Sequence, residues 1–369
     1  MPADALPPLL RQPKTLTLMP TYTCPAECTD CASMSSPRER SSIGRDVVLD
    51  AIREAHAIGD FHNVVFTGGE ATLRWRDLLD GIALATELGF PTRVVTNAHW
   101  ALSPRAARRK LGALIDAGLS EINYSTGDEH VRFIPLERVV HATVAALQLD
   151  LPLVIMVELR AERRITRADV EEHPLIAALD PELRERVRII ESPWMPLDPE
   201  TTERYPDGCA ADRANVGGRP GCDNVLQTYV VQADGRVGSC CGIGMRLIPE
   251  LNVATVDDPD FLARAISESE DDFLKLWIHT DGPEKILAWA AEKDPSIDWE
   301  GRYAHRCQAC ARLYRDPAVG RVIREHHDEM LTHVLQSVWI DEHLAPDVVR
   351  SALEHRRRPT PAGDGAAAG

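Results

Sequence analysis

Seven of the nine cysteines in this 369-residue chain fall into two sets with the spacing of metal ligands. The first set is compact and consists of Cys24, Cys28 and Cys31. The second set is spread over the C-terminal part of the chain and consists of Cys222, Cys240, Cys307 and Cys310. Thiolates are ligands of zinc and of iron–sulfur clusters, so both sets predict metal chemistry.

The compact set has too few thiolates to complete the tetrahedral shell of a structural zinc ion. Three thiolates can bind three irons of a 4Fe–4S cube and leave the fourth iron open to another ligand. A zinc site completed by a distant Cys or His is the alternative interpretation. The segments that surround the cysteines in the fold must distinguish the two.

The composition excludes several classes of function. A formal net charge of −16 opposes binding to a phosphate backbone, and basic residues are dispersed except at 355–358. No apolar run approaches the roughly 20 residues that span a bilayer, and the N-terminus lacks a signal-peptide pattern. We therefore expect a cytoplasmic protein without nucleic-acid or membrane partners, in which the cysteines bind metal or take part in catalysis rather than form disulfides.

Short β-branched runs alternate with helical patterns over the first half of the chain. One helical pattern, 102–118, has Ser103 as its N-cap, Pro104 at its first position and Gly118 as its stop, and Gly89 closes the preceding helix. Six such βα units predict an α/β fold, a partial (β/α)6 barrel of the TIM type, with functional residues on the loops after the strands. The predicted strands are 15–19, 63–67, 93–96, 121–125, 153–159 and 186–190.

A second unit follows a stretch rich in Pro and Gly that begins near residue 192. Asp234-Gly235, between the apolar runs 228–232 and 236–239, predicts a tight hairpin. Helical patterns then cover 260–269, 271–279, 283–293 and 319–338. The predicted segments are an N-terminal extension (1–14), the barrel core (15–200), an α+β module with the second cysteine set (201–315), a helical extension (316–358) and a disordered tail (359–369).

Polar segments follow the first four predicted strands in order. They are the CxxxCxxC loop at 24–31, Gly68-Gly69-Glu70, Thr96-Asn97, and the loop with Ser125 and Asp128. In this order they resemble the motifs of the radical S-adenosylmethionine (SAM) family. The resemblance implies that SAM binds the open iron and that an external electron donor, such as flavodoxin or ferredoxin, drives its cleavage to a 5′-deoxyadenosyl radical.

The resemblance also implies roles for individual residues. Gly68-Gly69-Glu70 receives the SAM amino group, and the loop with Ser125 and Asp128 lies near the ribose and carboxylate of SAM. Glu158, at the end of the fifth strand, is a candidate for hydrogen bonds to the ribose, with a solvated carboxylate as the alternative.

The chain departs from the family pattern at three places, so the adenine contacts cannot be transferred. Asp30 stands where an aromatic residue is common, Ala71 where proline is frequent, and Ala98 where the third-strand motif has glycine.

The second cysteine set resembles the twitch subdomain, a shorter relative of SPASM. Twelve residues separate Cys222 from Gly235, four more lead to Cys240, and a CxxC follows at Cys307 and Cys310. The resemblance implies a second, fully ligated 4Fe–4S cluster that accepts or relays an electron, with a zinc ribbon as the alternative.

Cys209 and Cys241 are outside both sets. Each is an inert packing residue, an alternative ligand, or a catalytic hydrogen-atom donor that quenches a substrate radical.

Relatives with such a module act largely on peptides, and some oxidise small molecules. We therefore predict oxidative crosslinking of a ribosomally synthesised peptide. The alternatives are a radical SAM dehydrogenase of a small metabolite, a redox-neutral peptide epimerase and a non-catalytic metal-binding protein.

The two cysteine sets predict about eight irons per chain in anaerobically prepared protein, as two 4Fe–4S clusters. Replacing Cys24, Cys28 and Cys31 together with Ala should halve the iron and abolish SAM cleavage. Iron analysis and product chromatography measure these outcomes, and stoichiometric zinc in the isolated protein would contradict the assignment.

Overall fold

The computed structural model describes residues 13–343. Within this range the strands form one nine-stranded sheet in the order β6-β5-β4-β3-β2-β1-β7-β8-β9. The first six strands are parallel and neighbour one another in chain order, as the sequence predicts for a partial barrel. They are β1 (Thr15–Leu18), β2 (Asn63–Phe66), β3 (Thr92–Thr96), β4 (Glu121–Thr126), β5 (Leu153–Leu159) and β6 (Arg188–Pro193).

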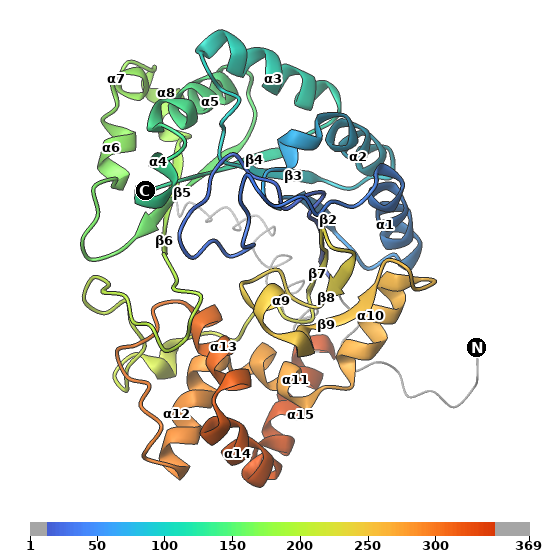
Figure 1. Cartoon of the computed structure of the whole chain (residues 1–369), viewed down its shortest axis with the longest axis vertical. Helices are drawn as coiled ribbons and strands as arrows, with labels where there is room; N and C mark the ends of the chain where they lie inside the picture. The colour runs from blue at the N-terminus through green and yellow to red at the C-terminus, as the bar shows by residue number, and fades with distance from the viewer. Residues whose placement is uncertain (1–12, 344–369) are drawn as a thin grey trace, which may run out of the picture.

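Helices cover the outer face of this half of the sheet (Figure 1). The main ones are α1 (Arg45–Ile58), α2 (Trp75–Glu87), α3 (Pro104–Asp116) and α5 (Leu136–Gln148). Shorter elements are η1 (Ala71–Arg74), α4 (Asp128–Val131), α6 (Arg167–Glu171), α7 (Pro174–Ala177) and α8 (Pro181–Glu185). The predicted helix boundaries at α3 are confirmed, because the Ser103 side chain accepts from the N–H of Ala106 and Gly118 takes a left-handed φ of 103°.

Alternate strand residues point into the core between sheet and helices. One such residue from each of the six strands is buried there: Leu16, Val64, Val94, Ile122, Ile155 and Ile189. Because strand side chains alternate between the two faces, the residues between them project from the opposite face. All six predicted strands are present, but the last one runs from Arg188 to Pro193, later than predicted.

The C-terminal part continues the same sheet. β7 (Thr228–Val231) pairs parallel with β1, and β8 (Arg236–Gly238) and β9 (Asn252–Thr255) follow antiparallel. The hairpin predicted at Asp234-Gly235 joins β7 to β8, and Gly235 has the left-handed φ of 85° that such a turn requires. The second cysteine set is therefore attached to the barrel through hydrogen-bonded strands.

Helices surround a second hydrophobic core below the sheet in Figure 1. They are η2 (Val216–Gly218), η3 (Pro249–Leu251), α11 (Phe273–Thr280), α12 (Pro283–Lys293), α13 (Arg306–Arg315), α14 (Pro317–His326) and α15 (Asp328–His343). Two further helices of this part pack elsewhere: α10 (Phe261–Glu270) buries its apolar residues in the first core, and α9 (Gly244–Leu247) buries Met245 in a small separate cluster. The segment boundaries at 200 and 315 stay predictions. The tail 359–369 and parts of segments 1–14 and 316–358 lie outside the described residues.

The prediction of one helix over 319–338 is wrong, because the chain breaks it into α14 and α15 at His327. Basic residues end α14, and Asp328 and Glu329 begin α15, an arrangement that satisfies two separate helix dipoles. The break also lets α14 pack on α12 and α13 while α15 packs on α11. No helix within residues 13–343 has the length and apolar character needed to cross a bilayer.

The loop after β1, which carries the first cysteines, lies directly on the loop after β2. Gly69 donates its N–H to the carbonyl of Thr21 (2.8 Å), and Glu70 donates to that of Thr23 (3.0 Å). A Cβ on Gly68 would lie 2.6 Å from the Thr21 oxygen, and one on Gly69 would overlap the backbone of Tyr22 and Thr23. Both glycines therefore allow two backbones to touch.

This contact predicts that Gly69→Ala destabilises the protein by about 1–3 kcal/mol, since the new methyl group meets backbone that cannot rotate away. Gly112→Ala is the matched control, because a Cβ at Gly112 meets nothing within 4 Å and lies inside α3. The control should stabilise the protein by about 0.5–1 kcal/mol. Denaturant unfolding measures both, and equal stability of the two variants would contradict the contact.

Candidate active site

A cavity of about 130 Å³ lies at the carboxyl ends of β1 to β4. All three cysteines of the compact set and six of the predicted SAM-binding residues line it. The lining consists of Cys24, Ala26, Cys28, Cys31, Ser33, Thr67, Gly68, Gly69, Glu70, Val95, Thr96, Asn97, Ser125 and His130. Segments that are far apart in the sequence thus meet at one site, as the partial barrel requires.

The thiols of the compact set are poorly solvated. Burial is the main cause of the raised pKa values of these thiols. It raises the pKa of Cys24 to about 12, and it also raises the pKa of Cys28. A bound metal reverses this effect, because a coordinating thiol is deprotonated. The side-chain amide of Asn97 (3.5 Å) and the backbone N–H of Ala26 (3.4 Å) donate to the Cys24 sulfur, as donors around iron–sulfur clusters do.

The donor set fits a cluster. Each cysteine of a 4Fe–4S cluster binds a different iron, so its three sulfurs border a space instead of one point. Cys24, Cys28 and Cys31 all line the cavity.

Glu70 braces the loops around the cavity. Its buried carboxylate accepts from the N–H and hydroxyl of Thr72 (3.2 and 2.6 Å), the hydroxyl of Thr96 (2.9 Å) and the N–H of Asn97 (3.0 Å). Thr72 and Thr96 donate to Oε1 and Asn97 donates to Oε2, so Oε2 keeps one of its two acceptor sites. The side chain predicted to receive the SAM amino group therefore joins the loops after β2 and β3.

The loop after β3 makes a left-handed turn at Ala98. Ala98 is buried and has a left-handed φ of 58°, a region that glycine favours. The hydroxyl of Thr96 holds this turn, because it accepts from the N–H of Ala98 and from the indole of Trp100 (both 3.1 Å). Thr96 and Asn97 consequently face the cavity as predicted.

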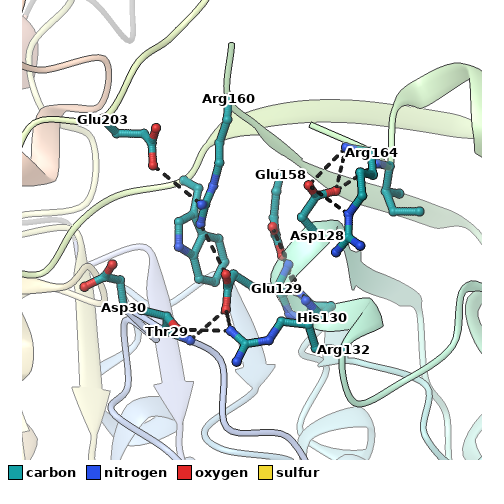
Figure 2. Close-up of polar contacts among 12 residues, drawn as sticks. Thr29, Asp30, Asp128, Glu129, His130, Arg132, Glu158, Arg160, Arg164 and Glu203 are labelled. Atoms are coloured by element: carbon teal, nitrogen blue, oxygen red, sulfur yellow. Dashed lines mark hydrogen bonds and ion pairs between the residues drawn. The ribbon is translucent and has the colours of Figure 1, made fainter. Parts of the chain in front are cut away.

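Two predicted cofactor residues are outside the cavity lining. Asp128 accepts from the backbone N–H groups of Arg164 and Ile165, which fixes the loop after β5. Glu158 accepts from the N–H groups of Glu129 and His130 and pairs with Nδ1 of the His130 ring (2.6 Å), as Figure 2 shows. Both carboxylates thus position the α4 loop, and their contacts to SAM stay predictions.

His130 lines the cavity, although residue types and spacing did not single it out. Its position five residues after Ser125, in the loop that resembles the family, was the available signal. Ser33 was missed in the same way, and its hydroxyl lies 3.4 Å from the Cys31 sulfur. The pair with Glu158 fixes the His130 ring, which also makes an edge contact with Trp194.

Glu129 ties the cysteine loop to the opposite side of the barrel (Figure 2). Its carboxylate accepts from the N–H of Thr29 (3.0 Å), pairs with Arg132 (2.6 Å) and lies 3.8 Å from Arg160, which also pairs with Glu203 (3.5 Å). Burial raises the pKa of Glu129, but the hydrogen bonds from Thr29 and Arg132 lower it more. The pKa of Glu129 is therefore below its ordinary value.

Asp30, the departure from the common aromatic residue, accepts from the N–H of Leu197 (3.1 Å) beyond β6. The cysteine loop is therefore fixed from two sides.

The second cysteine set also comes together. Burial raises the pKa of Cys240 and of Cys310, and the other cysteines of the set add to the effect. A Cβ on Gly242 would lie 2.7 Å from the Cys307 sulfur and 3.5 Å from that of Cys240, so glycine leaves room for both. The N–H of Gly242 donates to the Cys240 sulfur (3.2 Å), and Ile243 donates to that of Cys307.

The remaining cysteines are at the second set or near it, and neither lines the cavity of the first. Cys241 is close enough to Cys240 and Cys307 to raise their pKa, and its thiol donates to the side-chain oxygen of Asn224 (3.3 Å). The carbonyl of Cys209 accepts from Arg219 (2.6 Å). Their catalytic role as hydrogen-atom donors stays a hypothesis without support from this geometry.

The bracing by Glu70 predicts that Glu70→Ala weakens SAM binding by about tenfold or more and lowers stability by about 1–3 kcal/mol, since buried donors lose their acceptor. Iron content should stay unchanged. The exposed Glu87→Ala is the matched control and should leave SAM affinity as it is. Calorimetric titration with SAM measures the effect, and an unaltered affinity in Glu70→Ala would show that these loops do not position the cofactor.

Part of the chain is similar to a known protein. No family model matches the chain. The PqqA peptide cyclase of Rhodopseudomonas palustris is 34% identical over 117 residues, which are 31% of this chain and 28% of that protein. The match therefore spans less than a third of either protein.

The fold is similar to that of a solved structure. The structure of anSMEcpe with bound AdoMet (SAM) and a Cp18Cys peptide superimposes with a TM-score of 0.51 at 12% identity, over 88% of this chain and 99% of that one. BtrN in complex with AdoMet and 2-DOIA gives a TM-score of 0.40 at 13% identity, over 74% and 89%. The chain therefore has the fold of the anSMEcpe structure, and this fold places the three-cysteine loop beside Gly68-Gly69-Glu70.

Proposed function

We propose that this protein is a radical SAM enzyme that oxidatively crosslinks a ribosomally synthesised peptide. The observation that carries the proposal is the cavity shared by Cys24, Cys28, Cys31 and the loops after β2, β3 and β4. Three thiols hold three irons of a 4Fe–4S cluster and leave one iron for SAM. When bound, this cluster supplies the electron that cleaves SAM to a 5′-deoxyadenosyl radical.

The chain's own residues bind and orient the cluster and SAM. Cys24 receives N–H donors that stabilise its thiolate, and Gly68 and Gly69 bring the backbone of the second loop to the cavity wall. The cavity, of about 130 Å³, is smaller than the roughly 300–1,000 Å³ of complete small-molecule sites. The three cysteines would hold the cluster there, and Gly68, Gly69 and Glu70 would lie beside the SAM that binds it.

The second cysteine set supports an oxidative reaction. Four cysteines close the ligand shell of a cluster, so Cys222, Cys240, Cys307 and Cys310 leave no iron for substrate. Backbone donors to the sulfurs of Cys240 and Cys307 stabilise such a cluster. We infer that it accepts the electron that the substrate loses, and that an external flavodoxin or ferredoxin supplies the electron for SAM cleavage.

The comparisons favour a peptide as substrate. The curated relative is a PqqA peptide cyclase, and the structural neighbour anSMEcpe has a Cp18Cys peptide bound. A small-metabolite dehydrogenase is the alternative with the same redox balance. A redox-neutral epimerase would need a hydrogen-atom donor at the cavity, and neither Cys209 nor Cys241 lines it.

The oxidative role predicts that Cys307→Ala combined with Cys310→Ala retains SAM cleavage and loses the crosslinked product, because the substrate radical has no acceptor. The parent product should weigh two hydrogens less than the substrate. Mass spectrometry and the yield of 5′-deoxyadenosine measure the two steps. Cys209→Ala is the control and should form product normally, whereas a mass-neutral product that depends on Cys209 or Cys241 would establish epimerisation instead.

A further inference from the structure

Two large apolar side chains are exposed on neighbouring strands at the open end of the barrel. Met156 on β5 is 39% exposed and Ile190 on β6 is 38% exposed. The two residues are register partners, so their side chains lie next to each other on one face of the sheet. Together they form a small apolar patch within regular strands.

This pair projects from the face opposite the helices. Ile155 and Ile189, which precede Met156 and Ile190, are buried in the core between sheet and helices. Side chains alternate along a strand, so Met156 and Ile190 point away from that core. Glu158, two residues after Met156 on the same face, holds His130 of the cavity lining.

The pair is also continuous with the cavity. Ser125 on β4 lines the cavity and is the register partner of Met156. Ser125, Met156 and Ile190 therefore form one row across β4, β5 and β6. Adjacent strands are about 4.8 Å apart, so the row leads from the cavity wall to Ile190 over about 10 Å.

The row ends at a strand edge that can pair with a peptide. β6 is the last strand of the sheet, and among residues 13–343 no strand pairs with its outer edge. An extended peptide can add to such an edge through main-chain hydrogen bonds, with every second side chain on the face of Ile190. A side chain in that position lies about 4.8 Å from Ile190 and about 10 Å from Met156, so it contacts Ile190 directly and must be large to reach Met156 as well.

We propose that Met156 and Ile190 bind a large apolar side chain of a peptide that lies extended along β6, beside the cavity. The inference rests on the proposed function and narrows its substrate class to peptides with an aliphatic or aromatic residue near the modified position. The edge of β6 supplies affinity for any extended peptide, and the Met156–Ile190 pair supplies the preference for an apolar side chain.

Fluorescein-labelled pentapeptides Thr-Thr-X-Thr-Thr, with X as Leu, Phe or Ser, test the inference with the full chain reconstituted with iron, sulfide and SAM. Fluorescence anisotropy should give affinities for the Leu and Phe peptides about tenfold above that for the Ser peptide. The double variant Met156→Ser and Ile190→Ser should bind all three peptides alike, at the affinity of the Ser peptide.

Leu175→Ser is the matched control, because Leu175 is 40% exposed on α7 in the outer layer. It should retain the preference of the parent. Both variants should keep the iron content and SAM affinity of the parent, because the altered side chains are already exposed to water. Unequal binding by the double variant, or equal binding of the Leu and Ser peptides by the parent, overturns the inference.

SAM cleavage with a chemical reductant, without peptide, tests the proposed function separately. A parent that prefers apolar peptides through Met156 and Ile190 but does not cleave SAM overturns the function and supports the site. A parent that cleaves SAM without any preference among the peptides overturns the site and supports the function.

Discussion

The contact between the loops after β1 and β2 is the constraint on which the site depends. The cysteine loop hydrogen-bonds to the backbone of Gly69 and Glu70, and the glycines lack the Cβ atoms that would separate the two segments. Glu70 then connects this pair of loops to the loop after β3 through Thr96 and Asn97. Asn97 connects the loop after β3 to the cysteine loop, because its side-chain amide donates to the Cys24 sulfur. A cavity lined by segments from four strands is thereby fixed through a few short contacts.

Carboxylates around the cavity serve mainly to hold loops. Glu70, Asp128, Glu129 and Glu158 each accept from backbone N–H groups of segments distant in the chain. A buried carboxylate is costly without such donors, so these residues specify one arrangement of the loops. The network in Figure 2 joins the loops after β1, β4 and β5 and the segment after β6. The polar lining of the cavity consists of thiols, hydroxyls, the Asn97 amide and the His130 ring, with Glu70 as its one carboxylate.

The continuous sheet relates the two cysteine sets. β7 pairs with β1, and the hydroxyl of Tyr22, beside the first cysteines, donates to the Gln232 side chain (3.0 Å) just after β7. Arg246, which follows the second set's Cys240, donates to the carbonyl of Ser33 (3.1 Å) and lies over the Tyr22 ring (3.8 Å). Because the two sets share one framework, an electron acceptor in the second would keep a fixed position relative to the first.

The sequence by itself determined the features that depend on local pattern. The cysteine spacings, Gly68-Gly69-Glu70, the six βα units and the hairpin at Asp234-Gly235 can be read from neighbouring residues, and the structure has the strands and the hairpin. The sequence also predicted that Thr96, Asn97 and Ser125 lie at one site, because the carboxyl ends of parallel strands meet at one edge of the sheet. All three residues line the cavity.

The tertiary structure fixed the partners of the carboxylates near the cavity. Glu158 is 28 residues from the His130 that it holds, and Asp128 is 37 residues from Ile165. The break between α14 and α15 at His327 and the pairing of β7 with β1 also depend on packing between segments distant in the chain. A carboxylate after a strand has the same local pattern whether it binds a ligand or a distant N–H. Its partner is fixed by long-range packing, which spacing along the chain does not encode.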